Sequence, residues 1–314
     1  MAEASYGRED RRGYLARAGI TALNLIVPGL GLLRVGEWRA GALLLIAPFI
    51  LILLIGLGMG CLPITSFGHA VIALAAVTAS VAALYAVSTI LTWRRSRLRS
   101  PLQRWFRWYW LIAVAISVVV PLNLMAPLMH RLYKPFYAPS ESMAPTIGKG
   151  DKFIADMRWR GPYGRGQIII FKGPSNIRVS RIIALPGDRV AVRDGVPIVN
   201  GKSAVQLTVR RMNILGYDGR RSVMMLTERL PGEASTHQVL DMGAFNLDEM
   251  AEIKIPANRL FVLGDNRDRS ADSRVSPEAS GVGMVSMNSV IGRPMYIHWS
   301  DDRQKIGMRL DDQQ

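Results

Sequence analysis

Three short segments carry the residue types that nucleophilic catalysis requires. They are PSESMAPT at residues 139–146, RIIALPGD at 181–188 and GDNRDRSADSR at 264–274. A serine hydroxyl attacks a carbonyl carbon when a neighbouring group accepts its proton and nearby donors stabilise the oxyanion. Each segment alone is also typical of an ordinary turn, because Asp, Asn and Ser side chains bond readily to local backbone. Whether they do chemistry together depends on the elements that position them.

The second half of the chain predicts a mostly-β domain. Its short β-branched runs, separated by Gly and Pro, are typical of strands joined by tight turns. These runs lie at residues 153–156, 167–171, 179–185, 189–192, 197–201 and 259–265. We therefore expect a β-rich domain over residues 135–314. The more polar stretch 206–253 predicts an insertion within it.

The first half predicts a membrane domain over residues 1–134. The chain has 39 Lys and Arg against 24 Asp and Glu, a net charge of +15, and most of this excess lies in the first half. No Asp or Glu occurs between Glu37 and Glu141. Acid-free apolar runs separated by arginines favour a bilayer rather than nucleic acid as the reason for the positive charge. Three such runs predict spanning helices, at residues 40–61, 67–93 and 108–129.

A shorter apolar segment at residues 18–33 is interrupted by Pro28 and Gly29. Its length and its break favour a re-entrant segment over a straight crossing, although a fourth span stays open. The arginine-rich loop 94–107 is predicted to lie in the cytoplasm. The last span then runs outward, so the β-rich domain is expected outside the cytoplasm.

Taken in order, the three segments resemble those of the type I signal peptidases (bacterial leader peptidases, serine peptidase family S26). RGQIIIF at residues 165–171 lies where that family has an RGDxxxF strand, and the resemblance covers roughly residues 135–300. It implies a signal-peptidase-type catalytic domain behind N-terminal transmembrane helices. It also implies Ser142 as the nucleophile and Ser140 as a contributor to the oxyanion hole. The supporting residues that it implies are Ser270, Asp272, Arg274 and Arg181.

The implied activity is removal of signal peptides from exported precursors after small residues at the −1 and −3 positions. The implied location is a bacterial inner membrane, with several spans and a periplasmic catalytic domain. Signal peptides and the lipid bilayer are then the partners, with the secretion translocon as a further candidate. The single Cys61 and four scattered histidines predict no metal site, and no cofactor or nucleic acid is expected.

The sequence departs from the family at Ser180. The family has a lysine before the arginine that begins the second segment, and burial lowers the pKa of that lysine so that it can act as a base. Three interpretations follow. Lys172 or Lys152 reaches Ser142 instead; Ser180 relays a proton through water or Asp272; or hydrolysis is impaired and the protein acts as a peptide-binding or regulatory membrane module.

Overall fold

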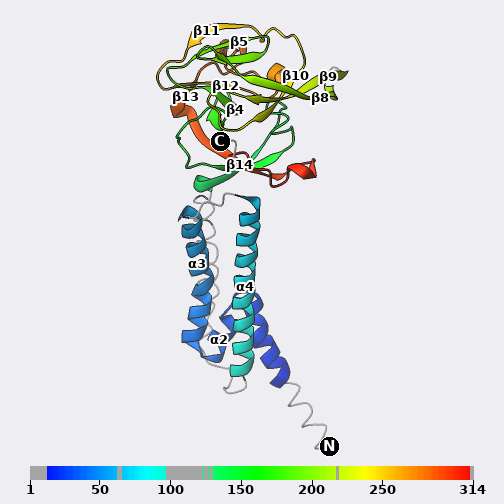
Figure 1. Ribbon diagram of the computed structural model, residues 1–314. Coiled ribbons are helices and arrows are strands. Elements are labelled where there is room, and N and C mark those ends of the chain that lie inside the picture. Colours follow the sequence, from blue (N-terminus) through cyan, green and yellow to red (C-terminus); the bar gives the residue numbers. More distant parts are fainter. Residues whose placement is uncertain are drawn as a thin grey trace, which may run out of the picture. The chain divides into compact units, whose positions relative to one another are not determined.

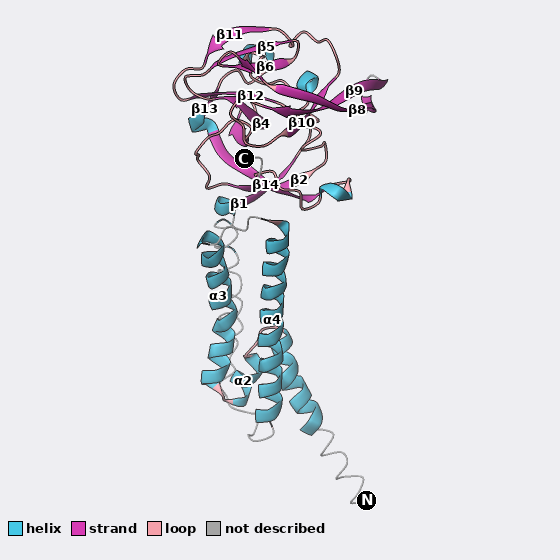
Figure 2. Ribbon diagram, viewed as in Figure 1, coloured by secondary structure: helices cyan, strands magenta, loops and turns pink. Residues whose placement is uncertain are grey.

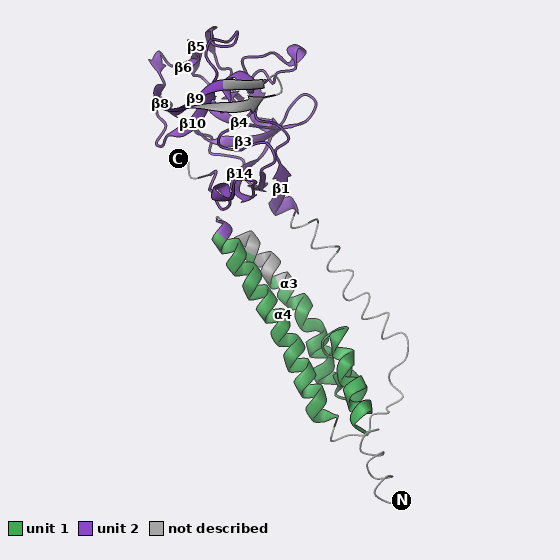
Figure 3. Ribbon diagram, turned by 90° about the vertical axis from the view of Figure 1, so that its right-hand side faces the viewer, with its two compact units in different colours: residues 1–64, 68–129 green, residues 65–67, 130–314 purple. Residues whose placement is uncertain are grey.

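The computed structural model describes residues 13–61, 66–96, 123, 127, 130–216 and 219–311. The chain divides into two compact units, shown in Figure 3. Residues 1–64 and 68–129 form the first unit, and residues 65–67 and 130–314 form the second. Each unit is described by itself below.

The first unit is helical over its described residues. Residues 13–22 form a helix, followed by η1 (Leu23–Leu25), α2 (Leu30–Val35), α3 (Trp38–Cys61) and α4 (Phe67–Arg95). Among the described residues, α4 alone is long and apolar enough to cross a membrane by length and composition, and the apolar stretch Trp38–Leu51 of α3 is shorter. The predicted span 108–129 lies outside the described residues, apart from 123 and 127. A multi-pass anchor therefore stays a prediction.

The break at Pro28 and Gly29 is present, because the chain leaves the helix after η1 and re-enters one at Leu30. Two backbone N–H groups freed by this break are satisfied by buried side chains. Gly29 donates to Ser88 Oγ (2.6 Å) on α4, and Gly31 donates to Asn24 Oδ1 (3.1 Å). Because an unsatisfied N–H in an apolar environment costs several kcal/mol, these contacts explain how the interruption is tolerated.

The second unit is mostly β, as the sequence predicts, and Figures 1 and 2 show its strands. All six runs singled out in the sequence form strands. The strands are β1 (Tyr133–Tyr137), β2 (Lys152–Asp156), β3 (Ile168–Lys172), β4 (Ile177–Ala184), β5 (Arg189–Arg193), β6 (Val196–Val199), β7 (Lys202–Ser203), β8 (Val205–Gly216), β9 (Gly219–Arg229), β10 (His237–Asp241), β11 (Met250–Lys254), β12 (Arg259–Leu263), β13 (Val285–Ser286) and β14 (Val290–Trp299).

The largest sheet has seven strands in the order β1-β2-β14-β3-β4-β12-β13. Its strand β4 changes partners along its length. Residues 177–181 pair with β3, whereas β12 pairs with β4 only from Arg181 to Ala184. Among the described strands, none pairs with the second edge of β4 between Ile177 and Ser180. The first half of β4 is therefore paired on one edge only among the described strands.

The remaining strands form two smaller sheets, β11-β5-β6-β7 and β10-β9-β8. The polar stretch 206–253 supplies most of the second of these and also β11, which pairs with β5. Buried aliphatic and aromatic side chains fill the unit, including Phe153, Ile170, Ile183 and Phe261 at 1% exposure or less. Ile168 to Phe171 of β3 are all buried, so this central strand is covered on both faces.

Candidate active site

Apolar side chains anchor the turn that carries Ser142 to the core. Met143 and Ile147 are buried at 3% and 1% exposure and pack in one cluster with Phe153. Ile147 N–H donates to the Met143 carbonyl (2.8 Å), which closes the turn. Because Met143 points into the core, its neighbour Ser142 remains partly exposed. Ser140 Oγ lies 3.1 Å from Ser142 Oγ, so the two hydroxyls share a hydrogen bond.

The segment 264–270 holds this turn from the other side. Asn266 donates its backbone N–H to the Ser142 carbonyl (3.1 Å) and its side-chain amide to the Glu141 carbonyl (3.1 Å). Gly264 lies so close to the turn that an added Cβ would come within 2.5 Å of the Ser142 carbonyl oxygen. Only glycine allows this approach without a shift of backbone. The first and third sequence segments are thus joined directly.

A cavity of about 320 Å³ opens beside the turn. It brings together four serines that the sequence singled out: Ser140, Ser142, Ser180 and Ser270. Its apolar wall comes from β1, the nucleophile turn and β2, through Phe136, Met143, Ile147 and Phe153. A small apolar cleft with a few convergent hydroxyls is typical of a binding site for a short peptide segment.

Ser180 occupies the wall of this cavity but does not bond to Ser142. It is 5% exposed, and its Oγ donates to the Val179 carbonyl (2.8 Å). Neither lysine that could replace the missing base lines the cavity. Lys152 lies 4.6 Å from the centroid of the Trp299 ring, and Lys172 is exposed at the end of β3. Of the described residues that line the cavity, only Arg178 carries a charge at neutral pH, and no lysine or histidine is among them.

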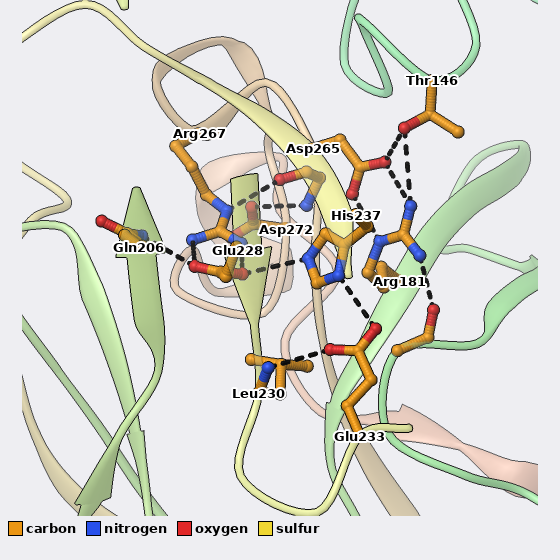
Figure 4. A network of polar contacts seen from close by, with 12 residues as sticks. Thr146, Arg181, Gln206, Glu228, Leu230, Glu233, His237, Asp265, Arg267 and Asp272 are labelled. Carbon is orange, nitrogen blue, oxygen red and sulfur yellow. Dashed lines mark hydrogen bonds and ion pairs between the residues drawn. The ribbon is translucent and has the colours of Figure 1, made fainter. Parts of the chain in front are cut away.

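Arg181 faces away from the cavity, as its position next to Ser180 on a strand requires. It is fully buried and forms a two-pronged ion pair with Asp265: Nε to Oδ1 is 2.8 Å, and an NH2 nitrogen to Oδ2 is 2.6 Å. Thr146 Oγ1 also donates to Asp265 (2.5 Å). Burial by itself raises the pKa of Asp265, but the Arg181 guanidinium outweighs it, and the pKa lies below its usual value. This pair links all three sequence segments (Figure 4).

Asp272 and Arg274 support the backbone next to the site rather than the cavity itself. Asp272 is fully buried, accepts from the Gly264 N–H (3.1 Å) and pairs with Arg274 Nε (2.9 Å). Asp272 does not line the cavity. The proposed proton relay from Ser180 to Asp272 therefore has no direct contact to support it. The pairing of Arg274 with Asp272 is the geometry that the resemblance implies.

A buried ionic cluster next to this network was not anticipated from the sequence. His237 lies between Glu233 Oε1 (2.9 Å from Nδ1) and Glu228 Oε1 (3.1 Å from Nε2), as Figure 4 shows. Glu228 also pairs with Arg267. Burial opposes ionisation of Glu228, but Arg267 and His237 outweigh it and lower its pKa. The only sequence signal for this cluster is the four-residue spacing of Glu233 and His237. That spacing brings side chains together on a helix, and these two residues lie outside one.

No group of three or more His, Cys, Asp or Glu side chains in the described part of the chain is arranged to hold a metal ion. The polar groups that the cavity presents are its hydroxyls, its backbone and Arg178. A serine nucleophile with a neighbouring hydroxyl donor is the combination that acyl transfer requires.

The family model described as "Signal peptidase, peptidase S26" matches residues 105–299, which is more than half of the chain and includes every segment of the site. The chain belongs to this family. It is thus a serine peptidase of the signal peptidase I type, as the three segments indicate.

Individual members of the signal peptidase family are also similar to this chain. Signal peptidase I of Bacillus licheniformis is 28% identical over 192 residues, covering 60% of this chain and 86% of that protein. Signal peptidase I of Bacillus caldolyticus is 30% identical over 197 residues, covering 62% and 90%. A crystal structure of a signal peptidase I from Enterococcus faecalis V583 matches with 29% sequence identity, 42% of this chain, 97% of that chain and a TM-score of 0.25.

Proposed function

We propose that this protein is a membrane-bound serine endopeptidase that removes signal peptides from exported precursors. Ser142 is the nucleophile, and the Ser140 hydroxyl stabilises the oxyanion together with the Ser142 backbone N–H. The observation that carries this proposal is the convergence of Ser140, Ser142, Ser180 and Ser270 on one cavity. Signal peptides of precursor proteins are the substrates, cleaved after small residues at −1 and −3.

The strand edges around the cavity support an extended substrate. Residues 136–140 and residues 176–180 both line the cavity. β1 lies at the end of the seven-stranded sheet, and residues 177–180 form the half of β4 that β12 leaves unpaired. A peptide that adds to such an edge donates and accepts backbone hydrogen bonds, while alternate side chains enter the cleft.

A second candidate function is favoured by the absence of a lysine or histidine from the described cavity wall. In this alternative the protein binds signal peptides in the same cleft but hydrolyses them slowly, and acts as a peptide-binding or regulatory membrane module. The two functions share the cleft and differ in turnover.

Substitution of the nucleophile separates them. Full-length protein in detergent is expected to cleave a preprotein, and Ser142→Ala should reduce cleavage to the rate measured without enzyme, because no other hydroxyl has the same anchored position. Cleavage is followed by gel mobility and by the N-terminal sequence of the product. Ser289→Ala, which removes a hydroxyl bonded to the Ser286 carbonyl away from the cavity, is the matched control. Equal cleavage by wild type and Ser142→Ala would contradict the nucleophile assignment.

The membrane arrangement is part of the same proposal. Residues 1–134 form a multi-pass anchor with spans at 40–61, 67–93 and 108–129 and a re-entrant segment at 18–33. The catalytic domain, residues 135–314, lies on the periplasmic side of a bacterial inner membrane. The apolar helix α4 and the basic residues that follow it support this orientation.

Cysteine-accessibility labelling tests the orientation. After Cys61→Ser, single cysteines at the exposed positions Lys172 and Arg193 should react with a membrane-impermeant maleimide added from the periplasmic side only. A cysteine at Arg97 should react only after the cytoplasmic side is opened. Reversed labelling of the two sets would contradict the arrangement.

A further inference from the structure

Arg178 is the one charged residue among the described residues that line the cavity, and the peptidase chemistry gives it no role. It lies two residues before Ser180 on β4, so both side chains emerge on the same face of the strand. This face lines the cavity. Arginine stays protonated at all physiological pH values, so Arg178 cannot replace the missing base. It places a permanent positive charge within the cleft that contains Ser142.

The Arg178 guanidinium has no partner within the described part of the chain. Its Nε is buried and makes no hydrogen bond, and no ion pair involves this residue. Three arginines of this domain with buried side chains are instead paired: Arg181 with Asp265, Arg267 with Glu228 and Arg274 with Asp272. A buried donor without an acceptor is costly, and more so when it is charged. Arg178 is half-buried, and it is the cation of the cavity whose buried Nε has no acceptor among the described residues.

The stem of Arg178 is held by the turn between β3 and β4. A Cβ at Gly173 would lie 2.9 Å from Arg178 Cγ, so the glycine makes room for the arginine stem. Gly173 N–H donates to the Asn176 carbonyl (2.8 Å), which fixes this turn. Arg178 therefore has a defined place along the half-open edge of β4, where an extended substrate would add.

We propose that Arg178 binds an acidic side chain of the substrate peptide, close to the scissile bond. This inference rests on the proposed function, because it assigns a substrate preference to the same cleft. A carboxylate supplies the acceptor that the guanidinium lacks, and arginine binds carboxylates through paired N–H groups. Peptides with Asp or Glu at the position opposite Arg178 are bound more tightly than peptides with the neutral amide.

Peptide binding to full-length Ser142→Ala protein in detergent tests this preference without cleavage. The probes are fluorescent peptides that span a signal peptide junction, with amidated C-termini, so that the scanned side chain is the only added carboxylate. A single Asp is scanned across the positions on both sides of the junction, with Asn at the same position as its reference. Fluorescence anisotropy gives each dissociation constant.

We expect Asp to bind about tenfold to a hundredfold more tightly than Asn at one position or at two alternate positions. Arg178→Gln should remove this preference, so that the dissociation constants of the Asp and Asn peptides become equal at every position. Gly173→Ala should weaken the preference while it retains the charge, because it displaces the arginine stem. Arg193→Gln is the matched control, since it removes one exposed positive charge outside the cavity.

The proposal is overturned if no position prefers Asp, or if the preference persists in Arg178→Gln. It is also overturned if Arg193→Gln removes the preference equally, because the effect is then one of net charge. If the neutral parent peptide binds and no position prefers Asp, the proposal that the cleft binds peptides stands and only the role of Arg178 is rejected. If only peptides with Asp bind, the role of Arg178 is supported and the binding of signal peptides in this cleft is rejected. If no peptide binds, both proposals are rejected.

Discussion

Ser180→Lys is expected to raise kcat/KM for preprotein cleavage by about 10²- to 10⁴-fold, the usual contribution of a positioned general base. Ser180 lines the same cavity as Ser142, so a lysine at this position extends toward the nucleophile. The surrounding wall includes Phe136 and Met143, and apolar burial lowers the pKa of a lysine. A neutral amine in this place can accept the proton of Ser142. Cleavage assays on full-length protein over a range of pH values provide the measurement.

Two matched variants separate a base from a change in shape. Ser180→Met introduces a similar length without an amine, and Ser180→Arg introduces a cation that cannot release its proton. Neither should raise the rate. Cleavage by Ser180→Lys should increase as pH rises through the pKa of the introduced amine, and the double variant Ser142→Ala/Ser180→Lys should be inactive. A gain in Ser180→Met equal to that in Ser180→Lys would show that cavity filling, not proton transfer, is responsible.

Asp265→Asn is expected to lower the free energy of unfolding of the second unit by about 3–5 kcal/mol, because it leaves the buried Arg181 charge uncompensated. Both side chains are at most 1% exposed, so water cannot replace the lost partner. Hydrogen–deuterium exchange of peptides from residues 130–311, followed through a urea titration of the full chain, measures this loss. Glu252→Gln is the control. It breaks an ion pair whose partners, Arg189 and Glu252, are 63% and 47% exposed, and should cost less than about 1 kcal/mol.

We also expect Asp265→Asn to change how the stability of the second unit depends on pH. The folded pKa of Asp265 is lowered, so the contribution of its charge is fully present above the unfolded pKa of about 3.9 and is lost as pH falls through the lower folded value. Asp265→Asn should therefore lose less stability than wild type as the pH falls below about 4. The double variant Arg181→Met/Asp265→Leu should recover most of the stability lost by Asp265→Asn. If stability falls at low pH in Asp265→Asn as it does in wild type, the lowered pKa of Asp265 is contradicted.

The sequence was most informative where local pattern and local structure coincide. Six β-branched runs formed strands because β-branched side chains favour an extended backbone and the Gly and Pro residues between the runs favour turns. The break at Pro28 and Gly29 appeared because proline cannot donate a backbone hydrogen bond and glycine favours a turn. The family was identifiable because three short motifs occur in one order. The substitution at Ser180 could also be read directly, by its position next to Arg181.

What surrounds Ser142 was decided only by the tertiary structure. The curvature and register of the seven-stranded sheet place β1 and the open half of β4 on one cavity, and no local pattern encodes that meeting. For the same reason, spacing along the chain could not exclude Lys152 and Lys172 from this cavity or pair Glu228 with Arg267. The sequence determined that a lysine is missing at position 180. Long-range strand pairing decided which side chains surround the nucleophile, because neighbours across a sheet depend on register and not on distance along the chain.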